Sequence, residues 1–342
     1  MFLLDSSTAS LLAGFAAALL LGLWVITYKA AKWRFEFYYL DFAVGFLLVS
    51  ALAFATLGSF GEGVTSMDNI AIVKPRLILM AVAAGAAAIL AVLLQLAFAS
   101  IAGVALSFLI SFSVALAVHY IQFLVVLGRG IPVFAIGAAV IALIAAGVAL
   151  SAYSAYAAEL RAAATPAPNT KQAPAGPSTG IGMTLGIGGG FVLGLLFLVI
   201  RLARVGDIEM QAYPIALFGG VGALLAAPVY DLFFINVPLR SQNPARIGRF
   251  FKGSARQHLL GLAGGLLFGA GYLLLLLGMY GETLESRMRS VQASFFGYGA
   301  AIPVALYGIV ALGELRSSRG LIFAYLSILL LAAALGLSLF AE

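Results

Sequence analysis

The chain of 342 residues contains no cysteine, only two histidines and few charged residues. Without cysteine it cannot form disulfides, thiolate metal sites, iron–sulfur centres or a cysteine nucleophile. Two histidines cannot supply a zinc site that needs three. Charged residues make up 9% of the chain, whereas soluble domains carry about a quarter. These shortages exclude a soluble enzyme and a disordered tail.

Several catalytic motifs are also missing. The sequence has no Walker P-loop, no HExxH pair and no nucleophile elbow. An ATP-driven pump and an intramembrane zinc protease are therefore disfavoured. We expect no enzymatic activity, no metal site and no cofactor.

The chain is instead rich in long apolar runs, since 63% of its residues are hydrophobic. Such runs suit membrane helices, which satisfy their own backbone in hydrocarbon, and not the alternating strands of a membrane β-barrel. We predict an all-α polytopic membrane protein of ten transmembrane helices. The predicted spans are 7–28, 38–58, 77–99, 102–126, 131–154, 181–201, 211–234, 257–280, 292–312 and 320–340.

The two halves of the chain carry similar patterns of small residues. Such residues recur at every fourth position of spans one and six, at an offset of 172 residues, and spans three and eight share a second register. Small residues at this spacing let helices approach closely in lipid. Both duplication of the chain and generic packing in a glycine-rich protein explain the pattern. The helix-packing candidates are Gly14, Gly22, Gly186, Gly190, Gly194, Gly261, Gly265 and Gly269.

A segment rich in proline, alanine and glycine separates the two halves. It suits an extended connector, so we divide the chain into a first five-helix repeat at 1–160, a linker at 161–180 and a second five-helix repeat at 181–342. Because five is odd, the repeats must insert with opposite orientations. Inverted repeats are a recurring plan of transporters, with the substrate site near the membrane midplane.

The basic residues predict how the chain crosses the cell (inner) membrane. If the loop after span one is cytoplasmic, the inner loops hold twelve lysines and arginines and the outer loops hold seven. The positive-inside rule then places both termini outside. Most of this bias comes from the loop Arg240 to Arg256.

Span four carries small and polar residues along one helix face. Ser107, Ser111 and His119 fall on this face at steps typical of a helix, and polar groups within spans are candidates for function. We predict that they contact a substrate. Bonding of the serines to their own helix, or of His119 to a neighbouring helix, is the alternative.

Four further side chains complete the predicted substrate site: Trp24, Gln95, Tyr272 and Tyr298. The Gln95 amide can both donate and accept hydrogen bonds, and the aromatic rings can stack on planar solutes or sugars. By contrast, we expect Trp33, Tyr38 and Tyr39 to lie in the interfacial aromatic belt. Pro303 is expected to kink span nine.

The acidic residues lie near the ends of the predicted spans. Asp41, Glu314 and Asp231 are expected to be solvated at the membrane interface, as is His258. Among them, Asp41 and Glu314 join His119 as candidates for ion coupling, because a transporter needs a titratable group.

Several short segments resemble the drug/metabolite transporter superfamily. The segment PVALYGIVALGE, from Pro303 to Glu314, resembles its ninth-span ending, and residues 128–150 resemble its fourth-to-fifth-span join. The closest branch is that of the ureide permeases and the glucose/rhamnose permeases. The segments that resemble this branch are GLWVITYK around Trp24, YYLDFAVG around Asp41, LLQLAFASIAG around Gln95 and FFINVPL around Asn236.

This resemblance implies uptake of a small neutral polar solute by alternating access. Ureides, nucleobases and monosaccharides are the substrate classes that it suggests. One departure is Phe108, which stands where plant ureide permeases carry an acidic residue in span four. It puts their proton coupling and ureide specificity in doubt for this chain.

From the sequence as a whole, with Asp41, His119 and Glu314 as candidates for ion coupling, we expect a proton-coupled secondary active importer. The alternatives are an exporter of metabolites or drugs and a non-transporting membrane sensor or scaffold. The expected partners are a small-molecule substrate and the lipid bilayer, with no nucleic acid; a homodimer is left open.

Overall fold

The protein is a bundle of long helices. The computed structural model describes residues 7–60, 64–127, 133–163, 179–236, 239, 246–279, 294–316 and 318–338, and within these ranges every regular element is a helix. Ten helical segments of the described residues are long and apolar enough to cross a membrane, which confirms the predicted number of spans. The chain is therefore a multi-pass integral membrane protein.

The spans follow the predicted order, and two short helices lie between them. The long helices are α1 (Ser7–Ala31), α2 (Phe35–Ala55), α4 (Pro75–Ala102), α5 (Val104–Leu127), α6 (Val133–Ala163), α7 (Thr179–Arg204), α8 (Ala212–Asn236), α9 (Ala255–Gly278) and α12 (Gly320–Leu337). The short ones are α3 (Ser66–Ile72) and the 3-10 helix η1 (Ile247–Lys252). Most of the predicted linker lies outside the described residues.

The ninth span is broken into three kinds of helix. A 3-10 turn η2 (Gly297–Ala300) leads into α11 (Ala301–Leu306), and the segment η3 (Tyr307–Ala311) follows as a π-helical turn. Pro303, which was expected to kink this span, lies in the first turn of α11, where a missing N–H costs little. The irregularity lies instead on either side of α11, in the 3-10 and π-helical turns.

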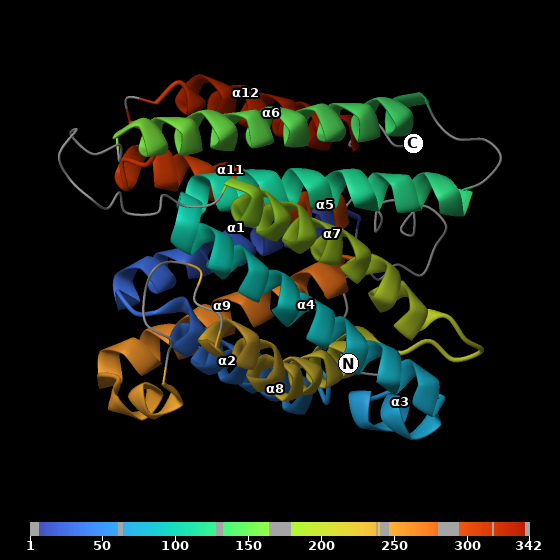
Figure 1. Cartoon of the computed structure of the whole chain (residues 1–342). Coiled ribbons are helices and arrows are strands. Elements are labelled where there is room, and N and C mark those ends of the chain that lie inside the picture. Colours follow the sequence, from blue (N-terminus) through green and yellow to red (C-terminus); the bar gives the residue numbers. More distant parts are fainter. Residues whose placement is uncertain are drawn as a thin grey trace.

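The long helices pack side by side with their axes roughly along the bundle (Figure 1). The pair α6 and α12 forms one edge, and the pair α2 and α8 forms the opposite edge. Between them, α1 packs on α9 and α7 packs on α4, while α5 contacts both α6 and α7. Most of the predicted substrate contacts belong to helices of this middle layer: Trp24 to α1, Gln95 to α4, Tyr272 to α9, and Ser107, Ser111 and His119 to α5.

Glycines allow the closest helix contacts. A Cβ atom on Gly265 of α9 would collide with the Phe42 carbonyl of α2, and one on Gly85 of α4 would collide with the Gly219 backbone of α8. Seven of the predicted packing glycines would bring a Cβ within 3.0 Å of a neighbouring helix: Gly22, Gly186, Gly190, Gly194, Gly261, Gly265 and Gly269. The eighth, Gly14, is buried.

Helix α4 extends from one end of the bundle to the other. Its 28 residues correspond to about 42 Å at about 1.5 Å per residue. Lys74, just before α4, is ion-paired with Asp207, which follows α7, at 2.7 Å. At the other end of α4, Ser100 and Ile101 line a cavity together with Lys29 of α1. Helices α1 and α7 therefore end at opposite ends of the bundle.

Candidate functional site

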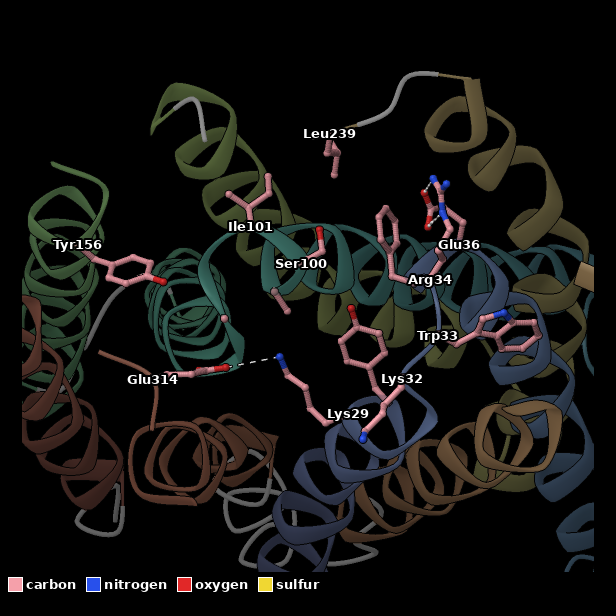
Figure 2. Close-up of a pocket in the computed structure, with 14 residues that line it drawn as sticks. Lys29, Lys32, Trp33, Arg34, Glu36, Ser100, Ile101, Tyr156, Leu239 and Glu314 are labelled. Atoms are coloured by element: carbon pink, nitrogen blue, oxygen red, sulfur yellow. Dashed lines mark hydrogen bonds and ion pairs between the residues drawn. The ribbon is translucent and has the colours of Figure 1, made fainter. Parts of the chain in front are cut away.

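A cavity of about 540 Å³ opens at the end of the bundle where α1 ends. Its wall comes from residues 28–36, the junction of α4 and α5, Tyr156 of α6, Leu239 and Glu314 (Figure 2). Every one of these segments belongs to a loop or helix end that the sequence assigned to the cytoplasmic side. The volume falls in the range of small-molecule sites.

Two ion pairs lie on opposite sides of this cavity (Figure 2). Lys29 Nζ is 3.5 Å from Glu314 Oε1, and Arg34 Nη2 is 2.7 Å from Glu36 Oε1. The fifth charged residue of the wall, Lys32, is exposed and adopts a φ of 47° directly after α1. Since four of the five charged side chains among the described wall residues are paired, these residues offer hydrogen-bonding groups with little net charge.

Glu314 also fixes the start of α5. Its carboxylate accepts hydrogen bonds from the N–H groups of Val104 and Ala105 at 3.0 and 2.9 Å. The helix N-terminus favours a negative charge, and Gly103, with a φ of 88°, leaves room for the carboxylate to approach. The expectation of a merely solvated Glu314 is therefore wrong, because the side chain joins the turn after the ninth span to α5.

Below the cavity, aromatic rings fill the space between α1 and α5. Trp24 lies one helical turn, about 6 Å, further into the bundle than Tyr28 of the cavity wall. Its ring lies 5.7 Å from that of Phe108, which stacks on Phe112 at 5.1 Å. Phe112 in turn lies 6.3 Å from Tyr298. We name Trp24, Phe108, Phe112 and Tyr298 the aromatic stack; each is at most 5% exposed.

His119 lies at the far end of this stack. Its Nδ1 is 3.1 Å from the Tyr298 hydroxyl, and its ring stacks on Phe197 at 4.5 Å. Sixteen residues of α5 separate it from Gly103 in the cavity wall, or about 24 Å. The structure thus brings together two predicted site residues, His119 and Tyr298, away from the open cavity.

The other predicted substrate contacts are buried between helices. Ser107 donates to the Gln95 carbonyl at 2.8 Å, and Ser111 donates to the Gly186 carbonyl at 3.2 Å. The Gln95 side-chain nitrogen and the Tyr272 hydroxyl are buried and have no hydrogen-bond partner among the described residues. None of the seven residues lines the open cavity, and Trp24, Gln95 and Ser107 each lie four residues along the chain from a residue that does.

Several side chains expected at the membrane interface are inside the bundle. Tyr38 and Tyr39 are fully buried and bond to the helix carbonyls of Trp24 and Ile89. Their assignment to the aromatic belt is wrong because this face of α2 points toward α1 and α4. Asp41 and His258 were expected to be solvated, but they bond to each other at 2.7 Å between α2 and α9.

Asp231 is the site residue that the sequence reading missed. It is 0% exposed, and neither of its carboxylate oxygens has a hydrogen-bond partner among the described residues. Its position near the end of a span predicts a solvated carboxylate at the membrane interface, and the burial shows that this prediction is wrong. The face of α8 that carries it packs against α2, and nothing in the local sequence reveals that contact.

At the opposite end of the bundle, polar contacts around Asn69 join α3 to the segment between α7 and α8. Its amide donates to the Glu209 carbonyl at 3.0 Å and accepts from the N–H of Gln211 at 3.0 Å. Nearby, Arg204 donates to the Met279 carbonyl at 3.0 Å, and the Lys74 ammonium holds the pKa of Asp207 below its usual value by hydrogen bonding. We name the contacts of Asn69 with residues 209–211 the Asn69 latch.

The chain matches no protein-family model and no curated protein sequence. Among the described residues, no three His, Asp or Glu side chains lie close enough together to hold a metal ion.

Proposed function

We propose that the protein is a secondary active transporter that imports a small neutral polar solute by alternating access. The observation that carries this proposal is the one-sided cavity. It opens at one end of a ten-span bundle, on the side of the aromatic stack where Trp24 lies. At the opposite end, among the described residues, the Asn69 latch joins α3 to the segment between α7 and α8. A cavity that is open on one side and blocked toward the other is what one state of an alternating-access cycle requires.

Pairing between helices supports an arrangement of two inverted five-helix repeats. In such an arrangement α1, α2 and α4 of the first half correspond to α7, α8 and α9 of the second. The contact of α1 with α9 then corresponds to that of α7 with α4, and the contact of α2 with α9 corresponds to that of α8 with α4. All four pairs are in contact. The inverted arrangement also agrees with α1 and α7 ending at opposite ends of the bundle.

Two contacts between single residues show the same correspondence between the halves. A Cβ on Gly22 would lie 2.9 Å from Val304 of the ninth span, and a Cβ on Gly194 would lie 2.6 Å from Val118 of the fourth span. Gly22 and Gly194 are 172 residues apart, which is the offset of the small-residue pattern. Each first span of a half thus meets the fourth span of the other half through a glycine and a valine.

The charges and the aromatic rings favour a neutral polar solute. Lys29 with Glu314, and Arg34 with Glu36, neutralise each other in the wall while they still offer donors and acceptors. Trp24 and Phe108 present ring faces on which a planar ureide, a nucleobase or a sugar could stack. The Gln95 side-chain nitrogen and the Tyr272 hydroxyl, which have no hydrogen-bond partner in the described part of the chain, are additional groups that a polar solute could bond.

We place the predicted contacts along one path. Trp24 meets the solute next to the open cavity, and Gln95, Ser107, Ser111 and Tyr272 lie between the helices of the middle layer. His119 and Tyr298 lie closer to the latched end, where they would be reached when that end opens. With both termini outside, the cavity seen here faces the cytoplasm.

The resemblance to the drug/metabolite transporter superfamily supports the same function. Its segments coincide with features of the site: Trp24 begins the aromatic stack, and the PVALYGIVALGE segment ends on Glu314. Phe108, the departure from the plant ureide permeases, lies in the aromatic stack. Its apolar ring there favours coupling through a carboxyl group elsewhere in the bundle.

A screen of solutes tests the proposal directly. The purified protein is tested for a rise in melting temperature with allantoin, uracil and glucose, and then for their uptake into proteoliposomes. A native-state binder raises stability by about 2.7 kcal/mol at 100 times its Kd. We expect Trp24→Ala to weaken binding at least tenfold, whereas Phe191→Ala, at a half-exposed aromatic position of α7, keeps it.

His119 provides the second variant of this test. If it forms part of the path, His119→Ala weakens binding or uptake in protein that still folds. If it serves only its bond to Tyr298, the variant loses melting temperature and keeps its affinity. Solute export would favour the exporter; binding without transport would favour a sensor, and no binding by any solute class would contradict the proposal.

A further inference from the structure

Asp231 is a buried carboxyl group without a visible compensating bond. It lies in α8 one turn after Pro228, the proline inside that helix, and both of its oxygens lack a hydrogen-bond partner among the described residues. An ionised carboxylate that is out of water and unpaired is very costly, by far more than a single hydrogen bond. The group must therefore hold a proton or meet a cation in another state of the protein.

The charged groups around Asp231 come mainly from the start of α2. Arg34 and Glu36 are close enough to interact with it electrostatically, and so is Tyr39. On α8 itself the neighbouring titratable group is Tyr230. Helix α4 contributes none in its second half, residues 88–102. Helix α9 carries Arg256 and His258 at this end of the bundle, and His258 is bonded to Asp41.

Two carboxyl groups therefore share the neighbourhood of one guanidinium. Arg34 is bonded to Glu36, which is 3% exposed, at 2.7 Å. Both Arg34 and Glu36 line the open cavity, whereas Asp231 is buried and is not one of its lining residues. Like charges close together disfavour joint ionisation, so the charge of Glu36 opposes ionisation of Asp231. Arg34 can stabilise a charged Asp231 fully only if it gives up part of its contact with Glu36.

We propose that Asp231 is the group that binds and releases the coupling proton, and that the Arg34–Glu36 pair links its protonation to the state of the cavity. This inference rests on the proposed transport function and names a residue for its coupling. With Arg34 on Glu36, Asp231 is neutral and its carboxyl O–H bond is intact. When Arg34 turns toward Asp231, that O–H bond breaks, the proton passes to water in the cavity, and the carboxylate remains paired with the guanidinium.

The first test needs no solute. Infrared spectra of the protein in lipid nanodiscs are recorded between pH 5 and 9, and the spectrum of Asp231→Asn is subtracted from that of the wild type. We expect a protonated-carboxyl band in the wild type that disappears as the pH rises within this range. A band that is absent at every pH, or one that never titrates, would overturn the proposal.

A second variant covers the case in which Asp231→Asn does not fold. Glu36→Gln removes the competing carboxylate and frees Arg34 for Asp231. Carboxyl groups beside an arginine release their proton about 1–3 pH units lower, so the band should titrate at least one unit lower in this variant. An unchanged midpoint would overturn the role of the Arg34–Glu36 pair. Glu159→Gln is the matched control, at a partly exposed carboxylate of α6 that accepts a hydrogen bond from the Arg319 N–H.

Transport then separates this proposal from the function on which it rests. Proteoliposomes are tested with radiolabelled allantoin, uracil and glucose. We expect Asp231→Asn to retain solute exchange but to lose at least tenfold of the accumulation that a proton gradient drives. Unchanged accumulation would overturn the coupling role while leaving the transporter intact. If the wild type moves none of these solutes, the proposed function fails, and the infrared titration still decides whether Asp231 exchanges a proton.

Discussion

Glu314 and Asp231 are carboxyl groups at the same end of the bundle in opposite surroundings. Glu314 accepts two backbone N–H groups and lies beside Lys29, so its charge is compensated. Asp231 has no hydrogen bond among the described residues and shares the neighbourhood of Arg34 with Glu36. The surroundings of Glu314 suit a carboxylate that stays ionised, and those of Asp231 suit a carboxyl group that gains and loses a proton.

Replacing Glu314 by glutamine should destabilise the protein. The amide keeps one acceptor oxygen, so one of the two N–H groups at the start of α5 loses its bond, and Lys29 loses its partner. Since hydrogen bonds to charged groups contribute about 1.5–3 kcal/mol, we expect a loss of about 1–3 kcal/mol. A lowered melting temperature in detergent would show it.

The control for this variant is Asp207→Asn. Asp207 pairs with Lys74 on the surface, where the side chains are 86% and 70% exposed, and exposed pairs contribute little. We expect its melting temperature to match that of the wild type. Equal effects of the two substitutions would contradict the structural role of Glu314.

Which polar residues lie near span ends could be predicted from the sequence, but their partners could not. Glu314 meets backbone groups about 210 residues earlier in the chain, and Asp41 meets His258 on another span. A position near a span end is compatible with both solvation and burial, because the choice depends on which helix covers that face. The same reason explains why Tyr38 and Tyr39 were assigned to the membrane interface.

At the scale of helices, α7 carries four glycines on the face that packs against α4 and α5: Gly186, Gly189, Gly190 and Gly194. A Cβ on Gly190 would lie 2.5 Å from the Ser111 carbonyl and 2.7 Å from Val114. Two residues earlier on the same helix, a Cβ on Gly188 would meet nothing within 4 Å. The pair of positions therefore separates close packing from the general cost of changing a glycine.

We expect Gly190→Leu to impair folding and Gly188→Leu to be tolerated. The leucine at 190 would force α7 away from α5, and overpacking of this kind costs about 1–3 kcal/mol or more. The yield of monodisperse protein and its melting temperature measure the effect. Comparable behaviour of the two variants would mean that the Gly190 face does not carry a tight helix contact.

The spans themselves followed from the sequence because their length is set by the bilayer. Two elements did not. Helix α3 is only seven residues long and exposes Met67 and Ile72, so it lacks the length of a span and the polarity of a loop. The mixed helix types of the ninth span depend on the backbone path between α1 and α5, which a hydropathy pattern does not contain.

For the whole molecule, the cavity and the Asn69 latch define two ends that face different compartments. The absence of cysteine makes the orientation testable with single cysteines. Phe251→Cys lies in η1 at a position that is 79% exposed, and Val205→Cys follows α7 at one that is 60% exposed. We expect an impermeant maleimide to label Val205→Cys in intact cells and Phe251→Cys only after lysis. The reverse pattern would place both termini inside.

In the proposed transport cycle, the contacts of Asn69 break when the latched end opens. This side chain is 2% exposed and makes two hydrogen bonds of 3.0 Å to the segment between α7 and α8. An alanine at this position makes neither bond. Because each such bond contributes about 0.5–1.5 kcal/mol net, the balance should shift by about 1–3 kcal/mol toward a state that is open at this end.

Asn69→Ala should therefore expose residues beyond the latch. Ser294→Cys, next to His119 and 2% exposed in the closed arrangement, reports on such opening. We expect Asn69→Ala to raise the rate at which an impermeant maleimide labels this cysteine by at least fivefold. Ser100→Cys in the cavity wall should be labelled more slowly from the other side in the same variant, because opening at one end closes the other. Faster labelling at both positions would indicate general loosening of the bundle and would contradict alternating access.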